Sequence, residues 1–260
     1  MAADKLSLIS SSGPPAENLR EMNAYLGISF SMSKYFSRSR MKQYFEWAGQ
    51  NISDLVVIVA DHFEGYNFNV FKGVPLETAF DKAYQVGIQF ATNYRRAIPP
   101  SLASRINIVL ASELLQRSKC AEVVALSRSL AKEDPEFKGD VDNAILELLA
   151  GKLEDAGYRG QNLKPALEVL QQYIFEEIAI ILYSAHLEVP AYPIAIFPYP
   201  PREVITKIYN NHYGGAFRLF TRGQPFRFVQ VAPSGFEVLK SHRNESYDEP
   251  LNEADLLEPR

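Results

Sequence analysis

Three serines stand on alternate positions in the segment AYLGISFSMSKYFSRSRMKQYF, which covers residues 24–45. An apolar run precedes them, aromatic and basic residues follow, and the serines are Ser29, Ser31 and Ser33. A hydroxyl between a strand and a helix lies near unpaired N–H groups, which can stabilise the oxyanion formed when it attacks a carbonyl. Ser29 is best placed for this attack, and Ser33 is the better candidate for a helix cap. Position alone leaves both readings of Ser29 open, because serines before helices commonly cap them.

A carboxylate lies in the apolar stripe of a helix predicted over residues 163–187. Residues three and four apart share a helix face, so Glu177 lies with Tyr173 and Ile181, whereas Glu176 lies on the polar side. We therefore expect Glu177 to be buried and Glu176 to be solvated. A buried carboxylate is costly unless it is paired. Two interpretations stay open: a structural pair that locks the helix, for example with an arginine, or a site for a ligand ammonium beside Tyr173.

A tyrosine between two prolines follows the fourth predicted strand, in IAIFPYPPREV. Prolines fix the backbone of the loop. A rigid loop of this kind can aim the Tyr199 phenol into a crevice, and the alternative is a tyrosine that only packs by its ring.

These residues depend on strands and helices that alternate along the chain. The clearest strand is DLVVIVAD at residues 54–61, an unbroken β-branched run typical of parallel sheets covered on both faces. Other strands are predicted in NAYLGISF, SRINIVLASEL and YPIAIFPYP, and helices over residues 35–50, 76–98, 119–132, 138–156, 163–187 and in PREVITKIYNNHY. The segment FRFVQVAP is expected to end the folded part. This alternation favours a doubly wound α/β fold, in which ligands bind beyond the carboxyl ends of the strands. Ser29 and Tyr199 both fall there.

Composition limits the possible organisation and partners. The 260 residues, 47% of them hydrophobic, can bury one full core, which we expect over residues 20–235. Residues 1–19 are expected to form a mobile N-terminal segment and residues 236–260 a flexible acidic tail. The net charge of −4 argues against a general polyanion binder. A single cysteine, Cys120, and the absence of a long apolar run predict a soluble cytoplasmic protein without disulfides.

Three motifs in order resemble those of the cyclodipeptide synthases, over about residues 20–232. GISFSMSKYFS matches the family's Gly-x-Ser followed by an aromatic-Phe pair, here Tyr35 and Phe36. YIFEE matches its Tyr-x-x-x-Glu, here Tyr173 and Glu177.

The third motif is similar to that of one of the two subfamilies. FPYPP supplies its Tyr-Pro, here Tyr199 and Pro200, and this subfamily lacks Asn three residues after the serine. Met32 stands at that position.

The resemblance implies a fold and a reaction. The fold is a single Rossmann-like α/β domain with a mostly parallel sheet flanked by helices, similar to the catalytic domain of class Ic aminoacyl-tRNA synthetases. The reaction joins two aminoacyl groups from aminoacyl-tRNAs into a cyclic dipeptide, a 2,5-diketopiperazine. An aminoacyl ester is already activated, so neither ATP nor any other cofactor or metal is expected.

The resemblance also implies roles for the motif residues. Ser29 takes the first aminoacyl group in a ping-pong reaction, and the second aminoacyl-tRNA converts this aminoacyl-enzyme into a dipeptidyl-enzyme that cyclises. Glu177 and Tyr173 hold the first ammonium and assist proton transfer, and Tyr199 orients or relays protons at the serine. No motif contains one of the histidines, so the group that deprotonates Ser29 is not identified and the histidines are assigned to surface or core.

Matching by position places further residues in the substrate site. They are Tyr25, Gly27, Val57 and Val59 around the first side chain, together with Met32 and Pro200. One extra residue separates Ser29 from Tyr35 here, compared with the family pattern. Tyr25 would narrow the pocket and so predicts a small or polar first amino acid, unless Tyr25 simply packs in the core.

Basic residues on two predicted helices are candidates for contact with tRNA phosphates. They are Lys34, Arg38, Arg40 and Lys42 on the first, and Lys82, Arg95 and Arg96 on the second. The alternative is the ordinary charge of exposed helices. We expect aminoacyl-tRNAs as partners, with no DNA and no membrane. The sequence does not indicate an oligomeric state, and a monomer is favoured.

Two other functions are compatible with the same residues. The first is a serine-dependent esterase or acyltransferase on a small molecule, which needs a histidine base that no triad context supplies here. The second is a non-catalytic aminoacyl-tRNA-binding module of the same fold, with Ser29 as a cap and Glu177 in a structural pair. Fold alone does not separate these functions.

Overall fold

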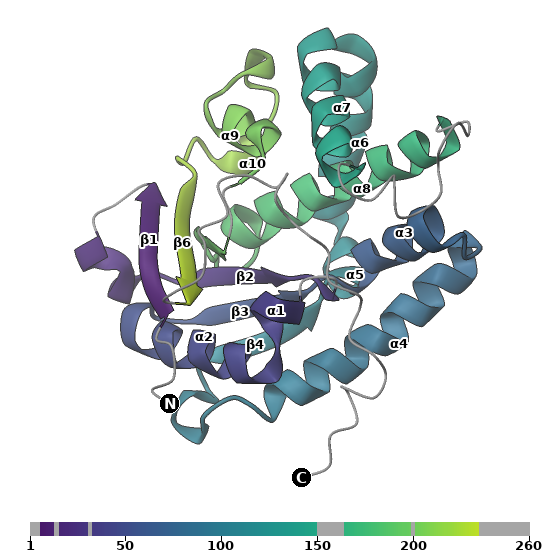
Figure 1. Ribbon diagram of the computed structural model, residues 1–260. Coiled ribbons are helices and arrows are strands. Elements are labelled where there is room, and N and C mark those ends of the chain that lie inside the picture. The colour runs from purple at the N-terminus through teal and green to yellow at the C-terminus, as the bar shows by residue number, and fades with distance from the viewer. Residues whose placement is uncertain (1–5, 13–15, 31–32, 150–163, 199–200, 234–260) are drawn as a thin grey trace.

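The computed structural model describes residues 6–12, 16–30, 33–149, 164–198 and 201–233. These residues form a single sheet with helices on both faces (Figure 1). The strands follow the order β1-β6-β5-β2-β3-β4. Their bounds are Leu6–Ser12 (β1), Ala24–Ile28 (β2), Leu55–Val59 (β3), Ile106–Leu110 (β4), Ile194–Phe197 (β5) and Arg227–Pro233 (β6).

Five of these strands run parallel, and β1 pairs antiparallel with β6 at the edge. The predicted mostly parallel α/β sheet is therefore confirmed. All five residues of β3 are buried, as its unbroken apolar run predicts for a central strand covered on both faces.

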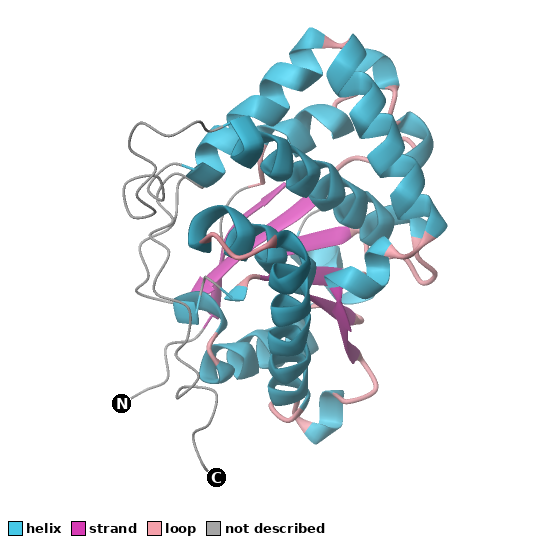
Figure 2. Cartoon of the chain, turned by 90° about the vertical axis from the view of Figure 1, so that its right-hand side faces the viewer, coloured by secondary structure: helices cyan, strands magenta, loops and turns pink. Residues whose placement is uncertain are grey.

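Helices cover the two faces of the sheet as separate layers (Figures 1 and 2). On one face, α2 (Arg38–Asn51) and α4 (Leu76–Arg95) pack against Leu26 and Val57. On the other face lie α6 (Ser118–Glu133), α7 (Pro135–Leu149), α8 (Lys164–Leu182) and α9 (Glu203–Tyr209). Because side chains alternate along a strand, Tyr25 faces this second layer although Leu26 faces the first.

Two helices at the carboxyl ends of the strands were not predicted. α3 (Asp61–Lys72) follows β3, and α5 (Ala111–Leu115) follows β4. The α3 segment, DHFEGYNFNVFK, contains a glycine and two asparagines, which are weak helix formers. Packing against α4 and α8 stabilises it instead. The remaining short elements are α1 (Ser33–Phe36), α10 (Arg218–Thr221), η1 (Ala16–Glu21), η3 (Pro100–Leu102), η4 (Tyr183–Leu187) and η5 (Tyr213–Gly215).

The expectation of a mobile segment over residues 1–19 is wrong for β1. Its Leu8 lies opposite Val231 of β6, so the strand extends the sheet by one edge. The serine content of this segment, LSLISSS, led to the expectation of a mobile terminus. Residues 236–260 lie outside the described part of the chain.

The cap of the long helix after β2 is also not the predicted one. Ser37, rather than Ser33, is the N-cap of α2, and its hydroxyl accepts a hydrogen bond from the Arg40 N–H at 3.4 Å. Ser33 is instead the first residue of the single turn α1. Ser37 therefore separates α1 from α2. Among the described helices, none is long and apolar enough to cross a membrane.

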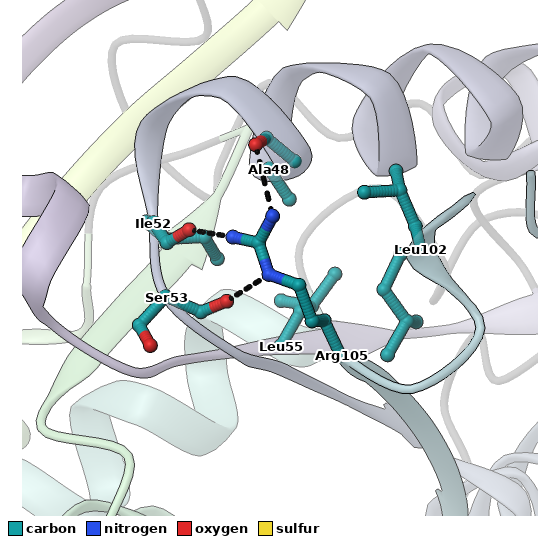
Figure 3. Close-up of a pocket in the computed structure, with 8 residues that line it drawn as sticks. Ala48, Ile52, Ser53, Leu55, Leu102 and Arg105 are labelled. Carbon is teal, nitrogen blue, oxygen red and sulfur yellow. Dashed lines mark hydrogen bonds between the residues drawn. The ribbon is translucent and has the colours of Figure 1, made fainter.

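Arg105 closes a small hollow at the amino ends of β3 and β4 (Figure 3). Its guanidinium donates hydrogen bonds to the carbonyl of Ser53 at 2.7 Å, to that of Gly49 at 3.2 Å, and to that of Ile52. Carbonyls at the end of a helix have no partner within the helix. Arg105 thus caps the end of α2 and ties it to the strand that follows. The hollow has no room for a water molecule and lies at the opposite end of the sheet from Ser29.

We expect Arg105→Met to lower the free energy of unfolding by about 2–3 kcal/mol, because these carbonyls lose a charged donor. Chemical denaturation monitored by circular dichroism measures the loss. Arg96→Met is the matched control, since Arg96 is an exposed arginine at the end of α4, and it should leave stability within about 0.5 kcal/mol of the parent. Equal stability of both variants would contradict the capping role.

Candidate active site

Ser29 lies directly beyond β2, where its hydroxyl donates a hydrogen bond to Glu64. The distance from Ser29 Oγ to Glu64 Oε1 is 2.7 Å. Glu64 is only 3% exposed and belongs to the first turn of α3. Its other oxygen, Oε2, accepts a hydrogen bond from Asn67 Nδ2 at 3.0 Å. The serine hydroxyl and a buried carboxylate thus form a contact at the carboxyl edge of the sheet.

Close packing fixes α3 at this edge. A Cβ on Gly65 would lie 2.2 Å from the Phe80 ring, and a Cβ on Gly87 would lie 2.6 Å from Asp61 Cβ, so both glycines allow α4 to approach α3. Asp61 is fully buried and accepts a hydrogen bond from the Ser112 N–H at 3.1 Å. Burial raises the pKa of Asp61 above its usual value, although the hydrogen bonds from Ser112 oppose the rise.

The two acids of α8 are placed differently from the prediction. The Glu176 side chain, expected to be solvated, is 12% exposed, and its Oε2 lies 3.0 Å from His62 Nε2. It also accepts hydrogen bonds from Tyr66 at 2.8 Å and from Gln172 at 2.6 Å. The prediction failed because the position of a residue within its own helix does not reveal that α3 packs over it.

Glu177, expected to be buried, is 25% exposed and forms an ion pair with Arg202. Arg202 Nε donates to Glu177 Oε2 at 3.1 Å, and Arg202 Nη1 lies 3.5 Å from Glu147 Oε2 of α7. Arg202 itself is 6% exposed. The arginine pair that the sequence left open is therefore present. Among the described residues, no group donates a hydrogen bond to the other oxygen of Glu177, Oε1.

Tyr173 lies between α8 and α3. Its ring centroid is 4.9 Å from that of Phe63 and 6.1 Å from that of Tyr66. Through these rings and Glu176, the helix that carries Glu177 contacts the helix that carries Glu64. Tyr199, the other predicted catalytic tyrosine, lies outside the described residues.

Tyr25 and Gly27 share one face of β2 with Phe197 of β5. The rings of Tyr25 and Phe197 meet edge-on at 5.9 Å. Tyr25 is 1% exposed, and its hydroxyl has no hydrogen-bond partner within the described part of the chain. Burial, then the charges of Tyr209 and Glu177, raise the pKa of Tyr25 well above its usual value, so the phenol stays protonated. The helix that carries Glu177, α8, packs over the same face of the sheet as Tyr25.

Val57 and Val59 do not line a pocket with Tyr25. In the parallel pairing of β2 with β3, Tyr25 lies opposite Val56 and Gly27 opposite Ile58. Val56 and Ile58 therefore share the face of Tyr25, whereas Val57 and Val59 pack into the core under α2 and α4. The prediction was wrong by one residue, which turns a strand side chain to the opposite face.

The basic residues predicted to contact tRNA differ in exposure and in their partners. Arg38 and Arg96 are exposed, Arg40 donates to Gln43 at 3.4 Å, and Lys42 lies 3.9 Å from Glu46. Lys82 lies over the Phe68 ring at 5.5 Å, and Arg95 donates to the Ile108 carbonyl at 2.8 Å, which ties it to β4. The side chain of Lys34, and Met32 and Pro200 of the substrate site, lie outside the described residues.

Sequence reasoning missed four residues at this edge of the sheet, namely His62, Glu64, Asn67 and Arg202. A signal existed for Glu64, because acidic residues just beyond the carboxyl end of a parallel strand fall where ligands bind. Arg202 carries no such signal, since its partners lie on α7 and α8. No group of three potential metal ligands occurs among the described residues.

A family model described as cyclodipeptide synthase matches residues 19–218. The chain belongs to the cyclodipeptide synthase family. Members of this family are tRNA-dependent enzymes that form cyclodipeptides. No curated protein matches the chain.

Solved structures of this family share the fold at low sequence identity. A cyclodipeptide synthase from Fluoribacter dumoffii is 11% identical, covers 90% of this chain and 99% of its own, and has a TM-score of 0.70. A cyclodipeptide synthase from Candidatus Glomeribacter gigasporarum bound to Phe-tRNAPhe is 17% identical, covers 88% of this chain and 94% of its own, and has a TM-score of 0.57. A Mycobacterium tuberculosis protein is 15% identical, covers 90% of this chain and 96% of its own, and has a TM-score of 0.60. Its structure demonstrates that cyclodipeptide synthetases are related to type I tRNA synthetases. The predicted resemblance of the fold to class I synthetases is thus confirmed.

We expect Gly27→Ala to lower the free energy of unfolding by about 1–3 kcal/mol through overpacking. The added Cβ would lie 2.8 Å from Phe197 Cε1, and the ring is held between Tyr25 and Phe228. Denaturant titration measures the change. The matched control is Gly139→Ala on α7, where nothing lies within 4 Å and helix propensity predicts a gain of about 0.5–1 kcal/mol. A Gly27→Ala variant as stable as the parent would show that the ring moves aside freely.

Proposed function

We propose that the chain makes a cyclic dipeptide from two aminoacyl-tRNAs by covalent catalysis on Ser29. Membership of the cyclodipeptide synthase family carries this proposal. The hydrogen bond between Ser29 and a buried carboxylate supports the role of this serine, since a nucleophilic hydroxyl needs a neighbouring proton acceptor. We place the catalytic domain over residues 20–235, with β1 as an added edge strand.

In the first step, Ser29 Oγ attacks the ester carbonyl of the first aminoacyl-tRNA. A new ester forms at Ser29, the bond to the ribose oxygen breaks, and the tRNA leaves with a free hydroxyl. In the second step, the amine of the bound residue attacks the ester carbonyl of the second aminoacyl-tRNA. An amide bond forms, the bond to the second ribose oxygen breaks, the second tRNA leaves with a free hydroxyl, and a dipeptidyl-enzyme results. The amine of the second residue then attacks the Ser29 ester, closes the diketopiperazine ring and frees Ser29.

Glu177 holds the ammonium of the first residue in this proposal. Arg202 fixes one carboxylate oxygen, and Oε1 is left for a second cation. The carboxylate then accepts the proton that the ammonium must lose before its nitrogen can attack. Tyr173, on the same helix face, contributes its hydroxyl to the same ammonium. We also propose the predicted role of Tyr199 in orienting or relaying protons at Ser29, and assign the chain to the Tyr-Pro subfamily with Met32 and Pro200 in the substrate site.

The pocket for the first amino acid lies on the face of Tyr25, Gly27 and Phe197. Two aromatic rings occupy this face, which leaves room for a small side chain, and the Tyr25 hydroxyl can bond to a polar one. We therefore propose a small or polar first amino acid.

The tRNA phosphates are proposed to contact the basic residues of α2 and α4. Arg38 and Lys42 on α2, and Lys82 and Arg96 on α4, are exposed and suited to this. Arg95 donates a hydrogen bond to the Ile108 carbonyl of β4, which favours a structural role for its side chain. Aminoacyl-tRNA substrates imply a cytoplasmic site of action.

Ser29→Ala should abolish the cyclic dipeptide, because the variant has no oxygen to carry the acyl group. The chain is expressed in bacteria, the medium is analysed by mass spectrometry for cyclic dipeptides, and the protein is tested for attachment of labelled aminoacyl groups. Glu177→Gln and Tyr199→Phe should lower the yield by about 10-fold or more while the fold is kept. Ser129→Ala is the control, since Ser129 is an exposed helical serine bonded to Glu133.

The assignment fails if Ser29→Ala makes as much product as the parent. A parent that hydrolyses small esters and releases no cyclic dipeptide would instead support the esterase alternative. A parent that binds aminoacyl-tRNA without either activity would support the binding module.

Tyr25→Leu should shift the products toward larger apolar amino acids, because the change removes a phenol from the proposed pocket. The measurement is the distribution of cyclic dipeptides by mass spectrometry. Tyr44→Leu is the matched control, since Tyr44 is an equally buried tyrosine on the opposite face of the sheet and donates to the Val231 carbonyl. A product distribution that Tyr25→Leu leaves unchanged would assign Tyr25 to the core alone.

A further inference from the structure

We infer that Glu64 is the general base that removes the proton from Ser29 when the first aminoacyl group is transferred. This inference rests on the proposed function, since it concerns the first step of that reaction. It names the group that the sequence motifs leave unidentified.

The first argument is the position of the proton. A general base must lie within hydrogen-bond reach of the proton that it removes. The Ser29 hydroxyl already donates to Glu64 Oε1 at 2.7 Å, so the proton points along the path of its transfer. No rearrangement of either side chain is needed before attack.

The second argument is that Glu64 is itself held in place. Asn67, one turn later on α3, donates to Glu64 Oε2 at 3.0 Å and fixes the orientation of the carboxylate. The Glu64 N–H donates to the Ala60 carbonyl at 3.2 Å, which anchors the residue in the first turn of the helix. A nucleophile, a base and a residue that orients the base are the arrangement found in covalent catalysis. Asn67 is a positioning residue here.

The third argument is burial. Glu64 is 3% exposed, so few water molecules compete for its oxygens. In a site with little water, electrostatic interactions between the carboxylate and the serine are stronger than they are in bulk solvent. Retaining a carboxylate in such a place is costly unless it has a partner or a role.

The other acid–base groups of the described chain are engaged elsewhere. His62 contacts Glu176, His186 is bonded to Tyr209 at 2.9 Å, and His212 lies 3.4 Å from Glu136. Glu177 is paired with Arg202. Among the groups that the structure describes, Glu64 is the carboxylate that contacts the reacting oxygen.

The proposed step balances as follows. The Ser29 O–H bond breaks, its proton moves to Glu64 Oε1, and the oxygen's electron pair forms the bond to the ester carbonyl carbon. When the tetrahedral intermediate collapses, the bond to the ribose oxygen breaks. Protonated Glu64 returns the proton to that oxygen, so the tRNA leaves as an alcohol and the carboxylate is restored.

The experiment measures single-turnover acylation of Ser29 as a function of pH. The full chain is mixed with excess aminoacyl-tRNA that carries a radiolabelled amino acid found in the parent's product, and protein-bound label is followed by rapid quench. Glu64→Gln keeps the shape and polarity of the side chain but has no basic carboxylate. We expect it to acylate about 100-fold more slowly or worse, with the tRNA concentration at half-maximal rate unchanged. We also expect its pH–rate profile to lack the acidic limb that the parent shows.

Two further variants separate a base from a purely structural residue. Glu64→Asp keeps a carboxylate one methylene further back, so we expect an intermediate rate with the acidic limb retained. It is also the second test if Glu64→Gln does not fold, as judged by circular dichroism. A rate equal to the parent's would then overturn the inference, because a base withdrawn by one methylene should slow the transfer. Asn67→Ala should slow acylation by about 10-fold and keep the acidic limb, because it disturbs only the orientation of the base.

Failure of the inference and failure of the proposed function give different results. If Ser29→Ala is acylated as fast as the parent, the proposed nucleophile is wrong. If the parent is acylated at Ser29 and Glu64→Gln is acylated at the same rate with the same pH profile, only the role of Glu64 is overturned.

Discussion

The parallel pairing of β2 with β3 is the constraint on which the candidate site depends. Both strands end at the same edge of the sheet, so the residue after β2 and the helix after β3 must lie next to each other. The Ala60 N–H donates to the Ile28 carbonyl at 2.8 Å and extends the pairing to the beginning of α3. One turn into that helix, Glu64 meets Ser29. The contact therefore follows from strand pairing together with a helix that begins directly after β3.

Charged groups at this edge are tolerated because each one has partners from a different element. Glu176 joins α8 to His62 and Tyr66 of α3, and Arg202 joins Glu177 of α8 to Glu147 of α7. These bonds satisfy partly buried carboxylates and also hold the helices over the sheet. The network that binds α3 to α8 is thus part of what positions Glu64.

The sequence was sufficient for features that depend on local pattern and insufficient for those that depend on neighbours. The β-branched run of β3 and the position of Ser29 beyond β2 could be read directly, because strand burial and chain order decide them. The relative burial of Glu176 and Glu177 could not be read in this way, because it depends on the packing of α3 against α8. The assignment of Val57 to the pocket failed for a second reason. Choosing a face of a strand requires the exact register, and the register is set by pairing with β2.

Glu64 and Glu177 illustrate how surroundings divide similar groups between two tasks. Glu64 is enclosed and accepts hydrogen bonds from Ser29 and Asn67, two neutral donors, one of which carries the proton to be moved. Glu177 is one-quarter exposed and faces a buried guanidinium with one oxygen, while the other oxygen has no hydrogen-bond donor among the described residues. An enclosed carboxylate with a hydroxyl donor suits proton transfer, and a partly open carboxylate held by an arginine suits the binding of a cation that enters from outside. A reaction that must deprotonate an alcohol at one point and hold an ammonium at another needs both environments, and α3 and α8 provide them on the same side of one sheet.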